Sequence, residues 1–124
     1  MGRHFSCYKL FDEKLDWKYA ETHCQLEGGH LVSIRSTEEN QFVTKFVKMD
    51  TWIGANDFNS EGAWEWSDGS TWDYSDWNPG NPNHDHLSML SVRHCGIIET
   101  SYNKKWEDEN CNQVNNFICR KIIL

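Results

Sequence analysis

The stretch Gly28-Gly29-His30-Leu31-Val32-Ser33-Ile34 decides the fold, because a helix ends at its two glycines and a strand-like run follows at once. The segment before it predicts a helix that begins after the N-cap Asp16 and carries Trp17, Ala20 and Cys24 on one face. Glycine ends a helix readily because it adopts the left-handed backbone of a helix C-terminus without steric cost. The apolar run that follows is short, which is typical of a strand.

A second helix is predicted directly after this stretch. Ser36 stands three residues before Glu39, which is the capping-box spacing of a helix N-terminus. Apolar residues then recur at helical spacing, and we expect them to form the buried face of this helix: Phe42, Val43, Phe46 and Val47.

The rest of the chain has the pattern of short strands joined by turns. Residues 5–11 predict an opening strand, residues 52–55 a buried strand and residues 63–67 an alternating strand. Three later runs predict the closing strands: residues 95–99, 104–108 and 116–122. Residues 70–94 show little periodicity, and loops of this length are commonly functional. The sequence therefore predicts an α+β fold with two early helices, an antiparallel sheet and one long irregular loop.

The composition bounds the class of protein. The chain of 124 residues is predicted to form a single domain over residues 1–124. Its formal charge of −7 argues against a general nucleic-acid binder. No window resembles a membrane-spanning helix and no apolar leader follows Met1, so we expect a mature fragment with no membrane span. Five cysteines in so short a chain indicate an oxidising compartment, which predicts a secreted or extracellular protein.

The long loop holds the stretch Trp77-Asn78-Pro79-Gly80-Asn81-Pro82-Asn83, which contains both prolines of the chain. Asn81 and Asn83 flank the second proline, and a cis bond before that proline would let two neighbouring amide oxygens point the same way. Further on, Glu107 and Asp108 offer adjacent carboxylates. Calcium prefers about six to eight oxygen ligands of this kind. We therefore expect the fold to bring these two segments together.

The cysteines are residues 7, 24, 95, 111 and 119. One cysteine must stay out of any two bridges, and the residues alone leave the pairing open, because sequence does not determine disulfide connectivity. Cys95 and Cys111 lie on or beside adjacent predicted strands. Cys24, on the inner face of the first helix, is within reach of Cys119 on the last strand.

Taken together and in this order, several landmarks resemble the C-type lectin-like domain, from about residue 5 to residue 121. They are Cys24, the run from Gly29 to Ile34, Trp52-Ile53-Gly54, Trp64 and Trp66, Cys95, Trp106, Cys111 and Cys119. The resemblance implies a double-loop fold with Cys24–Cys119 and Cys95–Cys111 bridges, and a ligand-carrying loop at residues 70–94. Cys7 matches the second cysteine of the N-terminal hairpin of longer members, whose first cysteine is absent here. Two alternatives stay open for Cys7: a partner upstream of this fragment, or a homodimer bridged through Cys7.

Sugar-binding members of this family hold calcium with a Glu-Pro-Asn or Gln-Pro-Asp tripeptide, a glutamate just before the third core cysteine, and an Asn-Asp pair after a tryptophan. On this chain the tripeptide falls at Asn81-Pro82-Asn83, the pair at Glu107-Asp108, and the glutamate position at Arg93. Asp85 is the candidate to replace the missing carboxylate. The resemblance implies calcium-dependent binding of a glycan or a cell-surface glycoprotein through Asn81, Asn83, Glu107 and Asp108. Two amides beside the proline do not indicate which sugar is preferred.

The alternative is a lectin-like module that binds a protein or another non-sugar ligand without calcium. Arg93 favours this alternative, because a guanidinium beside a calcium site is repulsive unless it points outwards. The two readings differ in what occupies the space between Asn81/Asn83 and Glu107/Asp108: an ion, a water molecule, or the side chain of Arg93.

Two further metal sites are weaker hypotheses. His84, Asp85 and His86, together with His94, form a minority prediction of a zinc site. Asp57 and Glu61 match carboxylates of an auxiliary calcium site in the family, whose other ligands would be His84, Arg93 and His94. That site is incomplete. The spacing from Asp57 to Asp68 also resembles an EF-hand, which the strand-like flanking segments exclude.

An enzyme is not expected. Neighbouring residues of a strand point to opposite faces, so Glu107 and Asp108 do not form a pair of carboxylates that flanks a glycosidic bond. Of the tryptophans, Trp72 and Trp77 are the candidates for stacking on a sugar from the loop. The core is expected to hold Trp52, Trp64, Trp66 and Trp106.

Overall fold

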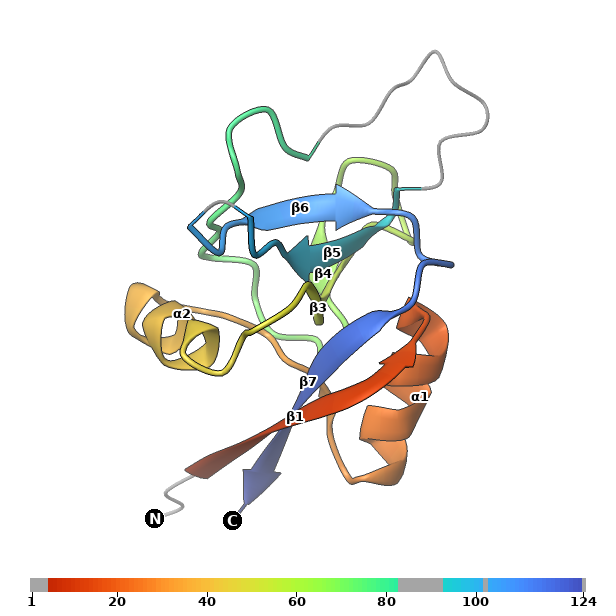
Figure 1. The fold of residues 1–124 in the computed structure, drawn as a ribbon, viewed down its shortest axis with the longest axis vertical. Coiled ribbons are helices and arrows are strands. Elements are labelled where there is room, and N and C mark those ends of the chain that lie inside the picture. The colour runs from red at the N-terminus through yellow and green to blue at the C-terminus, as the bar shows by residue number, and fades with distance from the viewer. Residues whose placement is uncertain (1–4, 83–92, 102, 124) are drawn as a thin grey trace.

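The computed structural model describes residues 5–82, 93–101 and 103–123, and it has the predicted α+β fold (Figure 1). In chain order the elements are β1 (Phe5–Leu15), α1 (Trp17–Leu26), β2 (His30–Leu31), α2 (Thr37–Thr44), β3 (Thr51–Asn56), β4 (Glu65–Trp66), β5 (Cys95–Ile98), β6 (Trp106–Glu109) and β7 (Asn115–Ile123). No helix within these ranges has both the length and the apolar character needed to cross a membrane.

Both helices begin at the predicted caps. The Asp16 side chain accepts a hydrogen bond from the backbone N–H of Tyr19 at 2.9 Å, and Gly28 follows α1 with a φ of +93°. Ser36 accepts from the N–H of Glu39 at 3.1 Å. The Glu39 carboxylate reaches back to the N–H of Arg35, at 2.8 Å, one residue before the position expected for a capping box. The local signals therefore determine where each helix starts.

The predicted buried face of α2 is only half correct. Val43 and Val47 are buried, but Phe42 and Phe46 are 44% and 42% exposed. The helix is only eight residues long, so only a narrow strip of its surface faces the core. It ends at Thr44, and Phe46 lies beyond this end. Phe42 packs outside the core, edge-to-face against Tyr8.

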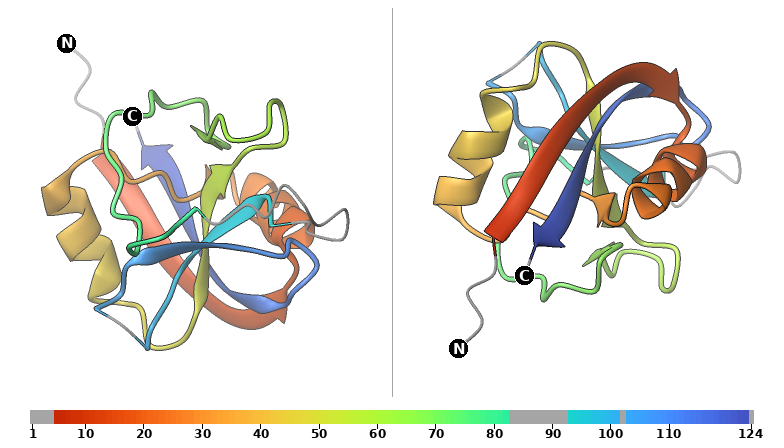
Figure 2. Two further views of the ribbon diagram at one scale, coloured as in Figure 1. Left: turned by 90° about the horizontal axis from the view of Figure 1, so that it is seen from above. Right: turned by 90° about the horizontal axis from the view of Figure 1, so that it is seen from below.

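The strands form one sheet in the order β1-β7-β3-β5-β6. β1 and β7 pair antiparallel near the two chain ends, whereas β3 runs parallel to β7. In Figures 1 and 2 the β1–β7 ribbon lies between α1 and α2, and β5 and β6 lie on the opposite side of β3. Every residue of β3 is buried, so this strand is the centre of the sheet.

The alternating strand predicted over residues 63–67 is much shorter than expected. Of residues 63–67, only Glu65 and Trp66 form a strand, β4, which pairs with β3 through the partners Ala55–Trp66 and Asn56–Glu65. Ser67 then donates its N–H to the Gly54 carbonyl, and the chain turns at Gly69, where φ is +81°.

Two disulfides cross-link elements of the core. Cys24–Cys119 links α1 to β7, and Cys95–Cys111 links β5 to the segment after β6. Both bridges implied by the family resemblance are therefore confirmed. Within the described residues, Cys7 is the free cysteine, and it is exposed on β1.

Candidate ligand-binding site

The long loop lies against β6 through backbone hydrogen bonds. The N–H of Trp106 donates to the carbonyl of Asp76 at 2.9 Å, and the N–H of Asn78 donates to the carbonyl of Trp106 at 2.8 Å. These bonds place the start of the proline-containing stretch beside Glu107 and Asp108. The two predicted segments therefore lie side by side in the fold.

A cluster of tryptophans supports this docking. Trp72 stacks on Trp66 with ring centroids 4.4 Å apart, and Trp77 packs edge-to-face on Trp64 at 4.9 Å. The ring of Trp106 lies in the centre and is fully buried. Trp72 and Trp77, the loop candidates for stacking on a sugar, are partly buried against the core, and their contact with a sugar stays a prediction. Trp64, expected in the core, is only partly buried.

The proline-containing stretch makes a tight turn before it leaves the described residues. The N–H of Asn81 donates to the carbonyl of Asn78 at 2.9 Å, Gly80 has a φ of +87°, and the bond between Asn81 and Pro82 is cis. Of the predicted ligands in this loop, Asn81 is partly buried. The others lie outside the described residues: Asn83, Asp85, His84 and His86.

Glu107 and Asp108 lie on opposite faces of β6. Trp106 and Asp108 are fully buried, whereas Glu107 and Glu109 are partly exposed on the other face. Glu107 accepts a hydrogen bond from the Asn78 side-chain amide at 3.1 Å. The two carboxylates therefore do not point into one site, and Glu107 already has an amide donor from the loop.

Arg93 lies against Asp108, the residue that the family uses as a calcium ligand. Its Nη2 donates to the Asp108 carbonyl at 3.1 Å and lies 3.4 Å from Oε2 of Glu109. Its Nε is 3.9 Å from Oδ2 of Asp108. An outward-pointing guanidinium was one of the two expected arrangements, and Arg93 does not adopt it. It brings a positive charge to two carboxylates instead.

Burial raises the pKa of Glu107, and the negative charges of Glu99 and Asp50 raise it further. The hydrogen bond from Asn78 and the charge of Arg93 lower it, but they do not offset the other effects. Burial is the largest cause, and Glu99 and Asp50 add negative charge near Glu107.

A Glu107→Gln substitution is expected to stabilise the protein slightly at neutral pH. The folded-state pKa of Glu107 is raised, so its ionisation costs stability as the pH rises through that pKa. We expect a gain of up to about 0.5 kcal/mol at pH 7, which disappears below about pH 4, where the unfolded-state carboxyl is protonated. Urea unfolding at pH 7 and pH 3.5 measures it. Glu13→Gln, on an exposed part of β1, is the matched control, and an equal gain there would contradict the assignment to this cluster.

The described donors do not fit a calcium ion in this arrangement. Glu107 and Asp108 diverge, and Arg93 lies beside the carboxylate that would bind the ion. Over residues 5–82, 93–101 and 103–123, no three His, Cys, Asp or Glu side chains are grouped closely enough to hold a metal.

The auxiliary site is also changed. Asp57 is buried, and its two oxygens lie 2.9 Å from Nδ1 of His94 and 2.9 Å from the N–H of Gly62. His94, which the minority zinc hypothesis needed, is therefore in contact with a buried carboxylate. The predicted strands on both sides of Asp57, which excluded an EF-hand, are present as β3 and β4.

Sequence reasoning missed two residues that build the site. Asp76 accepts hydrogen bonds from the Asn40 amide at 3.0 Å and from Nζ of Lys105 at 2.8 Å, which ties α2 to the loop. Asn78 links the loop to Glu107. The position of Asn78 within the proline-containing stretch was a signal for it, whereas nothing in the local sequence marks Asp76.

Comparison with known proteins agrees with this fold. The family model of the lectin C-type domain matches residues 13–121 of this sequence. C-type lectin lectoxin-Lio1 of Erythrolamprus poecilogyrus is 39% identical over 122 residues, which cover 92% of this chain and 72% of the relative. A calcium-independent type II antifreeze protein has a TM-score of 0.86 at 34% identity, covering 95% of this chain and 88% of the other. The carbohydrate-recognition domain of cow CD23, solved with a GlcNAc2Man3 oligosaccharide, has a TM-score of 0.85 at 32% identity, covering 96% and 89%.

Proposed function

The chain belongs to the lectin C-type domain family, and from that premise we propose that it is an extracellular recognition domain that binds a protein ligand without calcium. The proposed ligand surface is the end of the molecule where the long loop meets β6. The role is recognition and not catalysis. Two disulfides support an extracellular location, because such bridges persist in oxidising compartments.

The contact between Arg93 and Asp108 carries this proposal. A cation bound to Asp108 would lie next to the Arg93 guanidinium, whose Nε is 3.9 Å from the carboxylate oxygen. Near a protein surface, two unit charges about 4 Å apart interact by roughly 4 kcal/mol, and a divalent ion doubles the repulsion. Extracellular calcium modules bind with dissociation constants of only about 10⁻⁴–10⁻³ M, so repulsion of that size abolishes binding.

The choice of a protein ligand follows from the tryptophans. A sugar bound without calcium is usually held by a freely exposed aromatic ring, and here Trp72 and Trp77 are only partly exposed, since both pack against the core. The calcium-independent antifreeze protein shows that this fold is compatible with a calcium-independent activity in a protein 34% identical to this chain.

Calcium titration of the wild type and of Arg93→Glu tests the proposal. We expect 10 mM calcium to leave the free energy of unfolding of the wild type unchanged. Arg93→Glu places a third carboxylate beside Asp108 and Glu109, so it should be destabilised in chelator and regain about 1–3 kcal/mol in 10 mM calcium. Denaturant unfolding with and without calcium measures both.

Arg93→Gln is the matched control, because it removes the positive charge without adding a ligand. It should be destabilised by about 1–2 kcal/mol, since the buried Asp108 loses its guanidinium, and calcium should restore little. Stabilisation of the wild type by millimolar calcium would overturn the proposal. No calcium response in Arg93→Glu would show that Arg93 is not what excludes the ion.

Calcium-dependent glycan binding is the second candidate. The acidity around Glu107, whose pKa is raised by burial and by Glu99 and Asp50, favours it, because a bound cation would relieve that charge. The ligands would be Asn81, Asn83, Glu107 and Asp108, with Asp85, and Arg93 would have to move away. Glycan-array binding that disappears in chelator and in Asp108→Ala would support this candidate over the first.

A further inference from the structure

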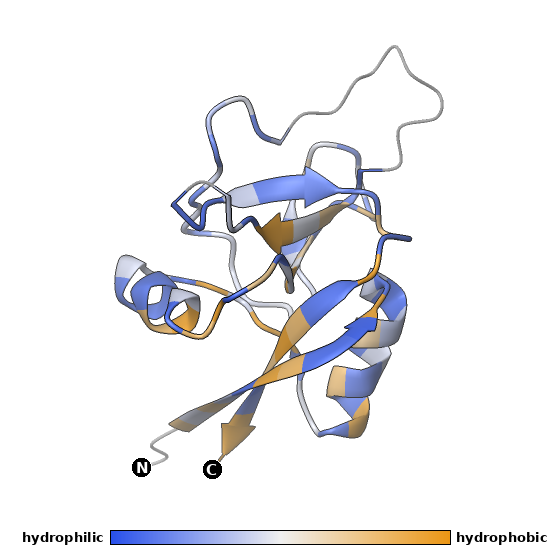
Figure 3. Ribbon diagram, in the orientation of Figure 1, coloured by the Kyte–Doolittle hydropathy of each residue, from blue (hydrophilic) through white to orange (hydrophobic). Residues whose placement is uncertain are grey.

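A polar hollow lies where β3 and β7 begin and where β1 and β5 end. Thr51, the first residue of β3, pairs with Ile98 of β5 and with Asn116 of β7. The residues just before Thr51 therefore lie between the end of β5 and the start of β7. The hollow has a volume of about 410 Å³, and its lining residues are Lys14, Lys48, Met49, Asp50, Thr100 and Asn115. Figure 3 shows hydrophilic residues at the end of β1 and at the start of β7.

Two exposed lysines bring positive charge to this hollow. Lys14 lies in a bulge of β1, where the pairing with β7 shifts between Phe11 and Leu15, and a bulge changes the direction of a side chain. Its Nζ lies 3.7 Å from Sδ of Met49, which is a weak acceptor. Within the part of the chain that the structure describes, neither Lys14 nor Lys48 takes part in an ion pair. Both ammonium groups are therefore available to an anion.

Asn115 and Asp50 add a donor and an acceptor. Asn115 is 7% exposed, and its Nδ2 is buried without a hydrogen-bond partner among the described residues. Buried polar groups are nearly always hydrogen-bonded, so this amide favours a bound acceptor. Oδ1 of Asp50 accepts from the N–H and from Oγ1 of Thr100, both at 3.0 Å. Its Oδ2 accepts no hydrogen bond over residues 5–82, 93–101 and 103–123.

We propose that this hollow binds an acidic saccharide, which is a sugar unit that carries a carboxylate or a sulfate ester. The anionic group lies between the ammonium groups of Lys14 and Lys48 and accepts a hydrogen bond from the Asn115 amide. A neighbouring hydroxyl group of the sugar donates to Oδ2 of Asp50. Met49, which is 48% exposed, packs against an apolar face of the sugar ring.

The combination of charges selects a saccharide over other anions. Two lysines against one carboxylate leave the hollow with a net positive charge, but Asp50 repels a simple anion. A sugar offers hydroxyl donors beside its anionic group, so it uses the lysines and Asp50 together. An acidic peptide would also bring apolar side chains, for which the hollow offers mainly Met49. The ionic contacts replace the exposed aromatic ring that usually holds a sugar without calcium.

NMR titration of the ¹⁵N-labelled chain tests this inference, which does not depend on the proposed function. The probes are a hyaluronate tetrasaccharide, which carries only carboxylates, and a chondroitin sulfate tetrasaccharide, which also carries sulfate esters. The buffer contains chelator and little salt, because salt screens the lysines. We expect the side-chain amide of Asn115 and the N–H of Thr100 to shift. Binding of both probes identifies the carboxylate as the anionic group, and binding of the sulfated probe alone identifies the sulfate ester.

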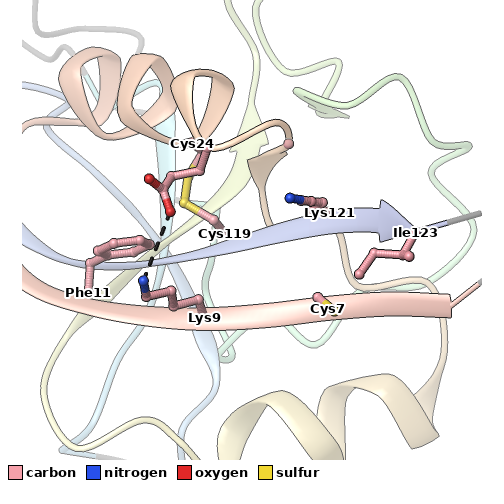
Figure 4. Close-up of a pocket in the computed structure, with 9 residues that line it drawn as sticks. Cys7, Lys9, Phe11, Cys24, Cys119, Lys121 and Ile123 are labelled. Atoms are coloured by element: carbon pink, nitrogen blue, oxygen red, sulfur yellow. Dashed lines mark ion pairs between the residues drawn. A yellow bond between two sulfur atoms is a disulfide. The ribbon is translucent and has the colours of Figure 1, made fainter.

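Lys14→Ala and Lys48→Ala should each weaken binding about 2–5-fold, and about 10-fold together, as expected for exposed charges. Lys48→Arg keeps the charge and should bind nearly as well as the wild type. Lys121→Ala is the matched control and should change nothing. It removes an exposed lysine from another hollow, which the Cys24–Cys119 bridge lines (Figure 4).

Asp50→Asn separates a saccharide site from a site for any anion. It should raise the affinity for inorganic sulfate, because a repulsive charge is lost, while the saccharide also loses an acceptor for its hydroxyl group. The ratio of saccharide affinity to sulfate affinity should therefore fall about 5-fold or more. An unchanged ratio would overturn the inference. So would saccharide binding that leaves the Asn115 side-chain amide unshifted, or a hexaglutamate peptide that binds there as tightly as either saccharide.

Discussion

Replacing Cys24 and Cys119 together by alanine is expected to lower the free energy of unfolding by about 4–5 kcal/mol. The bridge spans 95 residues, so it removes more conformational freedom from the unfolded chain than a short bridge does. Both cysteines are buried between α1 and β7, so their replacement also removes packed sulfur atoms from the core. Denaturant unfolding without reductant measures the effect, in a Cys7→Ser background that prevents exchange between thiols.

The Cys95–Cys111 bridge is the matched control for loop length. It spans only 16 residues, so its removal should cost about 3 kcal/mol in the same background. A larger loss from the short bridge than from the long one would contradict the entropic explanation. It would point instead to the packing of β5 against β6.

Trp106→Ala is expected to cost about 3–5 kcal/mol, because Trp106 joins the core to the long loop. Its ring is fully buried and contacts Trp66, Trp72, Tyr74 and Trp77. The loss should also release the loop, since the ring that supports Trp72 and Trp77 is gone. Hydrogen exchange at the Asn78 N–H, which donates to the Trp106 carbonyl, reports on that release.

Trp106→Phe is the matched control, because it keeps an aromatic ring at this position. It keeps an aromatic side chain in the cluster and loses the hydrogen bond from Nε1 to the Asn40 side chain, so it should cost about 1–2 kcal/mol. If Trp106→Ala lowers stability by less than Trp106→Phe, or if Asn78 exchange is unchanged in Trp106→Ala, the loop does not depend on this ring.

Local signals in the sequence predicted the parts of the fold that depend on neighbouring residues. The caps at Asp16 and Ser36 predicted both helix starts because a cap is satisfied within one turn. The strands of the sheet were also predicted, with ends that differ by a few residues. The disulfide pairing was different, because the residues left it open and only the resemblance to a family indicated it.

Tertiary structure decided the features that depend on residues far apart in the chain. Periodicity could not show how narrow the buried side of α2 is or that the helix ends at Thr44, so it wrongly placed Phe42 and Phe46 in the core. It could not show that Trp72 would find Trp66 as a stacking partner, which occupies one face of the Trp72 ring.

The candidate site shows the same division. The sequence by itself determined which residue types lie in the loop and on β6, and it identified Arg93 as the departure from the calcium pattern. Only the tertiary structure decided that Arg93 pairs with Asp108, because the contact spans 15 residues and depends on the register of β5 with β6. The alternation of β6 then turns Glu107 away from Asp108. A one-dimensional pattern specifies the donors, but the direction in which each donor points is set by strand pairing and burial.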